Sequence, residues 1–331
     1  MGKIKAAVIG LGRIASLLEE DSLREKPCTH AGAITSNPEC ILVSGCDTNE
    51  ERRRLFLEKW KAPVYKDAVE MLSIHRPQIL SIATHQDSHY HYCRLACDFQ
   101  IPVIICEKPL SDNITEARKI AKLAGQSGCV IITNHERRYS KDYIRAKEIL
   151  DEERLGKLTG VRACLYMGKT TKLLDQLWHD ATHLVDAVMF LTDSILKHRR
   201  RWGAKLSSCF GTAFLEAELK NKKSIHPVPV LFEIGAGRDY LVFELEFSCE
   251  KGRLRIGNGV FEVWRSVPSP YAEKFHSLQN TGDVFSGPTC YFKNMINDAV
   301  LCFKDPKRKP ASSAIDGLRV IEYLNAVKPW R

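Results

Sequence analysis

An apolar segment that runs straight into a glycine-rich turn limits the folds open to this chain. Residues 3–9 are mostly apolar and predict a strand, and Gly10-Leu11-Gly12-Arg13-Ile14-Ala15 follows at once. In this G-x-G-x-x-A pattern the first glycine permits a tight turn, and the second lets the backbone approach a pyrophosphate. Ala15 allows a helix to pack closely on the strand with its N-terminus facing the phosphates. The predicted cofactor-binding residues of this turn are Gly10, Leu11, Gly12, Arg13 and Ile14.

Strand and helix patterns alternate along the first 135 residues. Further strands are predicted at residues 41–46, 79–84, 102–106 and 129–133, and helices at residues 50–60, 67–73, 90–99 and 112–127. Such alternation is typical of a doubly wound parallel sheet. We therefore predict an α/β protein with a dinucleotide-binding Rossmann domain in residues 1–135 and an α+β substrate or oligomerisation domain in residues 136–331.

Asp47 ends the second predicted strand, where a carboxylate can accept hydrogen bonds from an adenosine ribose and would repel a 2′-phosphate. This favours NAD over NADP. Three arginines at positions 52–54 could instead accommodate a 2′-phosphate, although solvated charges on a helix are the simpler interpretation. The choice between NAD and NADP stays open at this stage.

Asp47 lies 37 positions after Gly10, whereas about 20 separate the acid from the fingerprint in a minimal unit. The surplus is the polar stretch Glu19–His30, which we interpret as an insertion between the first strand and its helix. We hypothesise that this insertion caps the cofactor or substrate cleft.

The strand at residues 102–106 is apolar on both faces, which is typical of a buried strand, and it ends in Glu107-Lys108-Pro109. Ligands bind at the carboxyl ends of the strands in open parallel sheets, so a lysine here is predicted to face a cleft. The turn after the strand at 79–84 is predicted to line the nicotinamide side of the same cleft. Its predicted cofactor-binding residues are Thr84, His85 and His89. Metal binding by His85, His89 and His91 is an alternative, but no thiol or paired carboxylate completes a known ligand spacing.

The motifs so far, together with Arg138-Tyr139, resemble those of the Gfo/Idh/MocA family of NAD(P)-dependent oxidoreductases, which includes glucose–fructose oxidoreductase and inositol dehydrogenase. The resemblance covers the first 140 residues in order, and Glu107-Lys108-Pro109 is its most specific element. It implies that Glu107, Lys108 and Arg138 lie at the cofactor. It also implies that Lys108 polarises the substrate hydroxyl from which hydride leaves.

The stretch Leu177–Val188 contains the histidine that the resemblance implies as proton acceptor, His183. His179 and His183 are spaced to share one face of a helix, with Asp180 beside them. The family's aspartate, four residues before this histidine, is replaced by His179, and the acid has moved to Asp180. The predicted catalytic residues are Lys108, His183, Asp180 and His179. Purely structural histidines, or a metal held by His179 and His183, remain alternatives.

The rest of the second half is rich in predicted strands, at residues 158–167, 210–219, 229–234, 241–249, 252–256 and 260–265, with helices at about 289–303 and 315–327. This resembles the family's open, mostly antiparallel sheet, whose bare face commonly forms the dimer interface or lines the active site. The resemblance therefore implies a homo-oligomer, either a dimer or a tetramer.

The charge and hydropathy patterns narrow the possible functions. The formal net charge is +9, but the basic residues are dispersed, and the clusters at 197–201 and 304–309 are interpreted as loop or terminal charge without a nucleic-acid motif. No apolar run approaches the roughly 20 residues of a membrane span, and no signal peptide is evident, so a cytoplasmic protein is expected. We predict a dehydrogenase that moves hydride between NAD or NADP and a secondary alcohol or ketone of a sugar, sugar derivative or cyclitol. The alternative is a catalytically silent dinucleotide-binding sensor, and no metal is predicted.

Overall fold

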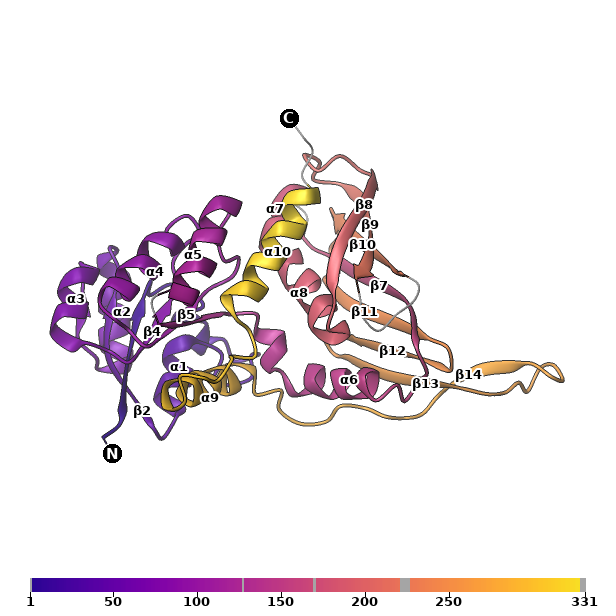
Figure 1. The fold of residues 1–331 in the computed structure, drawn as a ribbon, viewed down its shortest axis with the longest axis horizontal. Helices are drawn as coiled ribbons and strands as arrows, with labels where there is room; N and C mark the ends of the chain where they lie inside the picture. The colour runs from indigo at the N-terminus through magenta and orange to yellow at the C-terminus, as the bar shows by residue number, and fades with distance from the viewer. Residues whose placement is uncertain (1, 127, 169–170, 221–226, 328–331) are drawn as a thin grey trace. The chain divides into compact units, whose positions relative to one another are not determined.

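The computed structural model describes residues 2–126, 128–168, 171–220 and 227–327, and the chain divides into two compact units (Figure 1). The first unit consists of Met1–Ser140 and Pro288–Ile321, and the second of Lys141–Gly287 and Glu322–Arg331. This division differs from the single boundary after residue 135, because residues 288–321 return to the first unit. The reason is the buried face of a late helix, described below.

The first unit is built on the predicted parallel sheet, which has six strands in the order β3-β2-β1-β4-β5-β6. Strands β1, β4 and β5 are buried nearly throughout, which is why their sequences are mostly apolar runs, whereas β2 has one exposed and two half-buried residues. The strands are β1 (Ile4–Ile9), β2 (Cys40–Cys46), β3 (Val64–Tyr65), β4 (Ile79–Ile82), β5 (Val103–Cys106) and β6 (Val130–Thr133).

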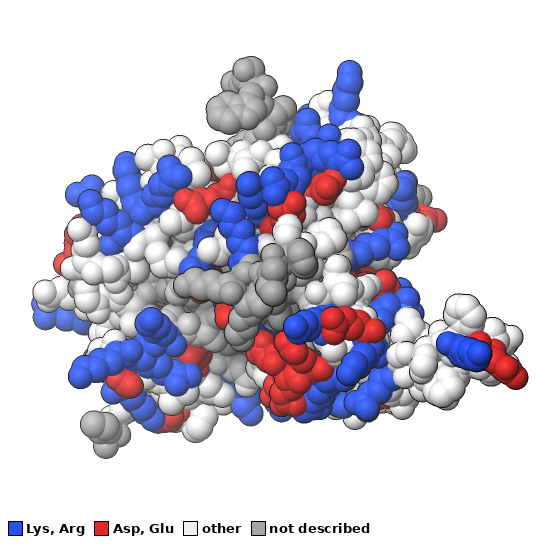
Figure 2. Space-filling model, turned by 45° about the vertical axis from the view of Figure 1, so that its right-hand side comes forward, with Lys and Arg blue, Asp and Glu red and all other residues white. Residues whose placement is uncertain are grey.

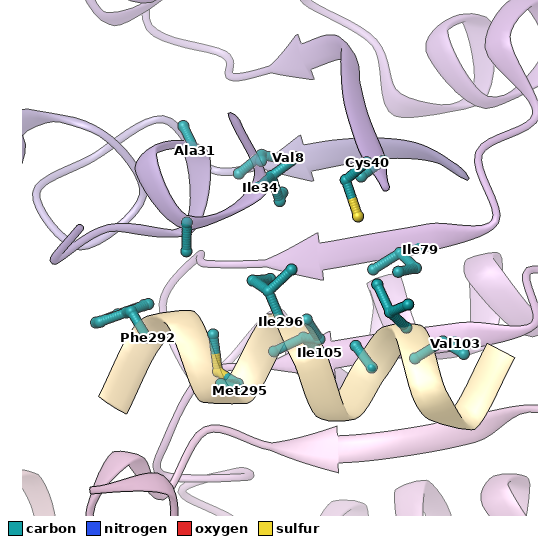
Figure 3. Close-up of a cluster of buried hydrophobic side chains, with 14 of the residues drawn as sticks. Val8, Ala31, Ile34, Cys40, Ile79, Val103, Ile105, Phe292, Met295 and Ile296 are labelled. Atoms are coloured by element: carbon teal, nitrogen blue, oxygen red, sulfur yellow. The ribbon is translucent and has the colours of Figure 1, made fainter. Parts of the chain in front are cut away.

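Helices cover both faces of this sheet. The helices between its strands are α1 (His30–Ser36), α2 (Glu50–Trp60), α3 (Ala68–His75), α4 (His89–Asp98) and α5 (Ile114–Gln126). One face is completed by α9 (Tyr291–Lys304), whose Phe292, Met295 and Ile296 pack with α1 and with Ile105 of β5 (Figure 3). Each such fully buried side chain contributes about 1.5–3 kcal/mol. This burial places residues 288–321 in the first unit.

The helix expected directly after the glycine turn is interrupted, which corrects the sequence analysis. Residues 12–16 form one turn, the short 3₁₀ helix η1 (Leu17–Glu20) follows, and the chain loops out before α1 begins. The His30 N–H donates to the carbonyl of Ile14, and the Ala31 N–H to that of Ala15. Helix α1 is thus bonded to the end of the first turn and continues the interrupted helix. The insertion lies within the fingerprint helix rather than before it, and this explains the long interval between Gly10 and Asp47.

The looped-out segment is fastened at both of its ends. Glu19 Oε2 accepts a hydrogen bond from the hydroxyl of Thr29, which is the N-cap of α1, at 2.6 Å. Glu25 accepts bonds from the backbone N–H groups of Thr289 and Cys290, each at 2.7 Å. The second pair of bonds caps the N-terminus of α9 with a carboxylate, which stabilises a helix N-terminus.

The second unit contains an eight-stranded sheet in the order β14-β13-β12-β11-β7-β10-β9-β8. All neighbours are antiparallel except β7 and β10, which confirms the predicted mostly antiparallel sheet. Its strands are β7 (Leu158–Tyr166), β8 (Ile195–Gly203), β9 (Gly211–Lys220), β10 (Val228–Ala236), β11 (Val242–Cys249), β12 (Gly252–Gly257), β13 (Val260–Pro268) and β14 (His276–Asn280).

Only one face of this sheet is covered by helices in the described part of the second unit. Alternate residues such as Phe232, Leu245 and Ile256 are fully buried on the covered face. The helices that pack there are α6 (Lys141–Asp151), α7 (Leu173–His179) and α8 (Ala181–Thr192). The opposite face carries charged side chains, including the exposed Arg162 and the half-buried Arg253 and Glu246. A two-sided pattern of this kind is expected of an antiparallel sheet with one open face.

The basic cluster at residues 197–201 lies in the edge strand β8, not in a loop as the sequence suggested. Arg199 pairs with Glu218 and Arg200 with Glu216, both on the neighbouring strand β9. Charged side chains on an edge strand also discourage unwanted strand pairing. On the face shown in Figure 2, basic side chains lie among acidic ones rather than forming one continuous stripe.

Two elements complete the chain, the 3₁₀ helix η2 (Glu136–Tyr139) after β6 and the last helix α10 (Ala314–Val327). The division between the units falls within α10, after Ile321. Across the residues the structure describes, no helix has the length and apolarity needed to cross a membrane.

Candidate dinucleotide and catalytic site

The carboxyl ends of the first unit's strands form one continuous row. The N–H of Gly10 donates to Cys46, that of Ala83 to Ile9 and that of Glu107 to Ile82. The residues that follow β1, β4 and β5 are therefore neighbours along one edge of the sheet. The chain leaves β1 toward β2 and later returns to β4 on the other side of β1, and ligands bind at such a switch point.

The surrounding protein backbone, independent of any ligand, requires a glycine at position 10. Its φ is +84°, and a Cβ there would lie 2.7 Å from the carbonyl carbon and oxygen of Ala83. Gly12 differs, because a Cβ there would meet nothing closer than 3.8 Å, at the guanidinium of Arg52. The protein alone would accept a side chain at position 12. A glycine at this position therefore suits the close approach of a ligand to the backbone.

The turn offers several hydrogen-bond donors. Within the described part of the chain, the N–H groups of Gly12, Arg13 and Ile14 donate to no protein acceptor. These residues are half-buried or exposed, and they open a helical turn whose carbonyls accept from Ser16, Leu17 and Leu18. Unpaired N–H groups at the start of such a turn are suited to phosphate oxygens.

Asp47 is fixed against this turn. Its Oδ2 accepts the Leu11 N–H at 2.8 Å, its Oδ1 accepts the Asn49 N–H at 2.8 Å, and the side chain is only 7% exposed. An ionised carboxylate has about four acceptor positions, so the predicted bonds to a ribose are compatible with this arrangement. Sequence reasoning identified the residue but not its bond to Leu11.

The three arginines after Asp47 occupy different environments. Arg52 Nη1 lies 3.6 Å from Asp47 Oδ2 and close to Gly12. Arg53 donates to the carbonyls of Asp47 and Thr48, whereas Arg54 pairs with Glu51 and Glu58 on the exposed face of α2. Only Arg54 fits the simple interpretation of a solvated helix charge. Arg52 is the arginine closest to the glycine turn.

Glu107 and Lys108 follow β5 directly. The Glu107 side chain is buried and accepts His30 Nε2 at 2.8 Å and Asn134 Nδ2 at 2.6 Å. Burial alone would raise the pKa of Glu107, but the bond and charge of His30, the Asn134 amide and the charge of Lys108 together lower it. Lys108 is half-buried, and its backbone N–H donates to Glu107 Oε2 at 3.2 Å. The carboxylate is therefore held inside the unit, next to the backbone of Lys108.

The three predicted cofactor-binding residues of the turn after β4 lie in different environments. Thr84 lies against Gly10, and His85 is exposed. His89 is buried, with Nδ1 3.0 Å from the Pro109 carbonyl and Nε2 3.1 Å from the Thr84 carbonyl. Burial lowers the pKa of His89 despite these carbonyls. His89 thus joins the turn after β4 to the segment after Lys108.

Arg138, also predicted at the cofactor, lies in η2 and is 9% exposed. Its Nη1 donates to the Ala311 carbonyl at 3.1 Å and lies 3.4 Å from Asp316 Oδ1. This arginine contacts the late segment of the first unit, a partner that no local pattern could indicate.

In the second unit the predicted catalytic residues lie at a helix break, which corrects the expectation of one continuous helix. Helix α7 ends at His179, Asp180 separates it from α8, and His183 occupies the first turn of α8. The Asp180 carboxylate lies 3.4 Å from His179 Nδ1, and its carbonyl accepts the His183 N–H. The His179 side chain is 67% exposed, whereas His183 is half-buried. In the described ranges, no group of three His, Cys, Asp or Glu residues is arranged to hold a metal ion.

Two buried residues of this region were missed by sequence reasoning. His30 belongs to the insertion, and Asn134 follows β6 in the same row of strand ends as Glu107. The position of Asn134 after a predicted strand was a usable signal. His30 had no comparable signal, because its contact with Glu107 spans 77 residues.

The strand order and the glycine turn define the class of the first unit, a dinucleotide-binding Rossmann fold. Residues 4–135 match the family model GFO_IDH_MocA, which is described as an oxidoreductase family with an NAD-binding Rossmann fold. Over residues 4–135 the chain is therefore similar to this Gfo/Idh/MocA family of oxidoreductases.

Characterised relatives are distant. The chain is 24% identical over 155 residues to myo-inositol 2-dehydrogenase of Thermotoga maritima, which is 46% of this chain and 42% of that protein. It is 23% identical over 255 residues to inositol 2-dehydrogenase of Salmonella typhimurium, covering 75% of this chain and 69% of the relative. D-Glucoside 3-dehydrogenase of Escherichia coli is 23% identical over 200 residues, which cover 57% and 54% of the two chains. The aligned part of the first relative is therefore less than half of that protein.

Solved structures share the fold over nearly the whole chain. An oxidoreductase domain protein from Kribbella flavida superposes with a TM-score of 0.79 at 18% identity, covering 99% of this chain and 96% of the other. UDP-N-acetylglucosamine 3-dehydrogenase from Acidithiobacillus ferrooxidans gives a TM-score of 0.77 at 16% identity, with 99% and 97% coverage. At such identities the similarity concerns the fold alone.

Proposed function

We propose that this chain is an NAD(P)-dependent dehydrogenase that moves hydride between nicotinamide and a secondary alcohol or ketone of a sugar, sugar derivative or cyclitol. One observation carries the proposal. A glycine turn with unpaired N–H groups, an anchored Asp47 and the half-buried Lys108 all follow strands at one edge of a single sheet. Dinucleotides bind at this edge in Rossmann folds.

The residues of the first unit fit a dinucleotide. The N–H groups of Gly12, Arg13 and Ile14 would bind the pyrophosphate, Asp47 would accept the ribose hydroxyls, and Thr84, His85 and the Glu107–Lys108 segment would border the nicotinamide. When bound, the nicotinamide supplies or accepts the hydride. Lys108 would polarise the substrate oxygen, because an ammonium group stabilises the negative charge that develops there.

His183 is assigned as the proton-transfer residue, since an imidazole titrates near neutral pH. Asp180 would then act on His179 rather than as the family's aspartate, because its carboxylate lies 3.4 Å from His179 Nδ1. His179 would occupy the position of the family's aspartate in the sequence, four residues before His183, without supplying a carboxylate. The roles of His179 and Asp180 rest on the resemblance to the family and on this one contact.

We propose NAD as the preferred cofactor. The buried Asp47 carboxylate would repel a 2′-phosphate, and Arg52 offsets that repulsion only in part because 45% of its side chain is exposed. Equilibrium binding of NAD⁺ and NADP⁺ to the wild type, Asp47→Ala and Arg52→Ala tests this preference. Asp47→Ala should lose affinity for NAD⁺, and Arg52→Ala should lose affinity for NADP⁺ more than for NAD⁺. A wild type that binds NADP⁺ more tightly would refute it.

The substrate class rests on the relatives, which are named as inositol, glucoside and UDP-N-acetylglucosamine dehydrogenases. The test is a screen for reduced-nicotinamide absorbance over inositols, sugars and nucleotide sugars, with either cofactor. Any active substrate should lose turnover with Lys108→Ala by two or more orders of magnitude, while the affinity for the cofactor is largely kept. Full activity in that variant would show that Lys108 takes no part in the reaction.

A catalytically silent dinucleotide sensor is the second candidate. It is favoured by the position of the acid at Asp180, next to His179, instead of four residues before His183. Tight binding of NAD⁺ with no absorbance change on any compound of the panel would support the sensor and refute the dehydrogenase.

We also propose that the open face of the second sheet joins copies of the chain in a homo-oligomer. Tyr166 and Arg162 both hold the buried Glu233 on that face, and Tyr240 packs edge-on against Tyr166. Aromatic and arginine side chains of this kind are enriched in protein interfaces. Light scattering of the wild type should give a dimer or tetramer, and Tyr240→Glu should dissociate it. A monomeric wild type would refute the proposal.

A further inference from the structure

The run of basic residues in β8 contains an arginine without an acidic partner. Arg199 and Arg200 pair with Glu218 and Glu216 of β9. Arg201, the next residue, forms neither an ion pair nor a hydrogen bond with any residue in the described ranges, and its Nη1 is shielded from water. A guanidinium withdrawn from water without a counter-charge is costly. Arg201 is therefore a candidate for binding an anion.

The strand register places Arg201 on the helix-covered face of the second sheet. Arg201 lies opposite Leu215 of β9, and Leu215 lies opposite Phe232 of β10. Side chains paired across neighbouring strands point to the same face. Leu215 and Phe232 are both buried, so Arg201 is directed toward the covered face rather than the open one.

His198 is directed toward the same face because β8 is irregular. Residues three apart point to opposite faces of a regular strand. A register shift between His198 and Arg200 changes this, since His198 lies opposite the fully buried Ala217. The irregularity thus brings an imidazole and a guanidinium to one side of the edge strand.

Tyr323 of α10 completes the group. Its ring packs edge-on against His198, with centroids 6.1 Å apart, and against Phe232, with centroids 5.6 Å apart. Tyr323 is only 3% exposed and belongs to the second unit, as β8 does. Because Phe232 lies in the same row of the sheet as Arg201, these contacts place Tyr323 in the neighbourhood of both basic side chains. We call His198, Arg201 and Tyr323 the β8–α10 cluster.

Each member of the cluster has a polar atom that is shielded from water and unpaired within the part of the chain that the structure describes. These atoms are His198 Nδ1, Arg201 Nη1 and the Tyr323 hydroxyl. Burial raises the pKa of Tyr323, so its hydroxyl keeps its proton and can donate. Burial and the charge of Arg201 lower the pKa of His198, so its ring is neutral and can donate from one nitrogen. The cluster thus offers donors and a positive charge.

We propose that the β8–α10 cluster binds an oxyanion, a phosphate or carboxylate group carried by a small molecule. Arg201 supplies the charge and matches two oxygens of such a group with parallel N–H donors, and Tyr323 and His198 supply further hydrogen bonds. Arg201 and His198 are only half-buried, so a small ion can reach them. The cluster shares no residue with the proposed dinucleotide site or with His183, and the inference therefore goes beyond the proposed function.

The test is isothermal titration calorimetry of the full-length protein with sodium phosphate and, separately, with sodium acetate, at an ionic strength held constant with sodium chloride. The glycine turn is also a proposed phosphate site, so the quantity compared is the affinity of the wild type against that of Arg201→Gln. We expect at least one of the two ions to bind the wild type at least tenfold more tightly, because hydrogen bonds to charged groups are the stronger class. The ion with the larger difference identifies the group that the cluster binds.

Matched variants separate the cluster from the general charge of β8. Arg200→Gln removes the adjacent arginine, which is paired with Glu216, and should keep the wild-type affinity. Tyr323→Phe keeps the ring and loses only the hydroxyl, and it should weaken binding by about threefold to tenfold. Without added ion, Arg201→Gln should unfold at no lower temperature than the wild type, because it removes an unpaired charge. The added ion should then raise the unfolding temperature of the wild type more than that of Arg201→Gln.

Three results would overturn the proposal. One is a wild type that binds neither ion, or binds both no more tightly than Arg201→Gln does. Another is an equal loss of affinity in Arg200→Gln and Arg201→Gln, which would reduce the effect to the overall charge of the strand. If Arg201→Gln fails to fold, an unchanged affinity in Tyr323→Phe decides against the proposal.

Discussion

In the first unit, several of the proposed cofactor residues follow strands of one parallel sheet directly and are held by hydrogen bonds to neighbouring segments. Leu11 N–H to Asp47 and Glu107 N–H to Ile82 are examples. In the second unit, His183 lies after a helix break, and its N–H donates to the carbonyl of Asp180 within that break. Regular sheet edges suit the binding of a cofactor that proteins of one fold have in common. Irregular segments can differ between such proteins and so allow the substrate preference to vary. The predictions below test this division of roles, from the largest expected effect to the smallest.

His183→Asn should lower turnover by roughly 10²–10⁴-fold, because the amide cannot exchange a proton with the substrate. The affinity for the dinucleotide should stay within error, since none of the proposed cofactor residues lies in the second unit. Steady-state kinetics and fluorescence titration measure the two quantities. His276→Asn, at an exposed position in β14 of the same unit, is the matched control and should leave turnover unchanged. Weaker cofactor binding with unchanged turnover would contradict the division.

Gly10→Ala should instead weaken cofactor binding and lower the stability of the first unit. The new Cβ would lie 2.7 Å from the backbone of Ala83, and φ at this position is +84°. We expect a loss of more than about 1 kcal/mol in unfolding free energy together with weak cofactor binding. Urea unfolding and NAD⁺ titration measure both effects. Gly125→Ala in α5, where a Cβ would meet nothing within 4 Å, is the control and should be neutral or stabilising.

Glu25→Ala should destabilise the first unit by about 0.5–2 kcal/mol, because the N-terminus of α9 loses the carboxylate that caps it. Equilibrium unfolding in urea provides the measurement. Glu70→Ala, at an exposed position in the first turn of α3, is the comparison and should cost less. Equal losses in the two variants would show that Glu25 does not stabilise α9.

The acid dependence of stability should differ between wild type and Glu107→Gln. The folded-state pKa of Glu107 lies below its ordinary value, so the stability it contributes is present above that ordinary value and is lost as pH falls through the folded-state pKa. The difference in unfolding free energy between the two proteins should therefore stay constant from about pH 7 down to about pH 5, and it should shrink as pH falls below the ordinary value of 4.5. Glu233→Gln tests the same effect in the second unit, where Arg162 and Tyr166 lower the pKa of Glu233 against its burial. A difference that stays constant down to the lowest pH at which the protein folds would contradict the assignment.

Arg54→Ala should change neither stability nor cofactor preference measurably. Its partners, Glu51 and Glu58, are exposed on α2, where water and salt screen the pairs. Thermal unfolding and the ratio of the NAD⁺ and NADP⁺ affinities should match the wild type. If Arg54→Ala altered the ratio of the two affinities as strongly as Arg52→Ala, then proximity to Gly12 would not determine the cofactor preference.

The sequence predicted those parts of the fold that depend on local patterns. The parallel sheet followed from apolar runs, and Gly10, Asp47 and Glu107 followed from their positions after strands. Features that depend on distant partners were missed. Nothing near His30 indicates Glu107, and nothing near Arg138 indicates Asp316. Strand β8 was missed because its alternation is concealed by a run of basic residues and a register shift after His198.

Helix α9 has a consequence for the order in which the protein is made. The Rossmann unit buries β5 and α1 against Phe292, Met295 and Ile296, but the ribosome delivers these residues only after all eight strands of the second sheet. The nascent first unit must therefore wait with one apolar face uncovered while roughly 150 further residues are added, at about 5–20 residues per second. For those seconds Glu25 has no helix to cap, and the exposed face is a natural binding site for a chaperone.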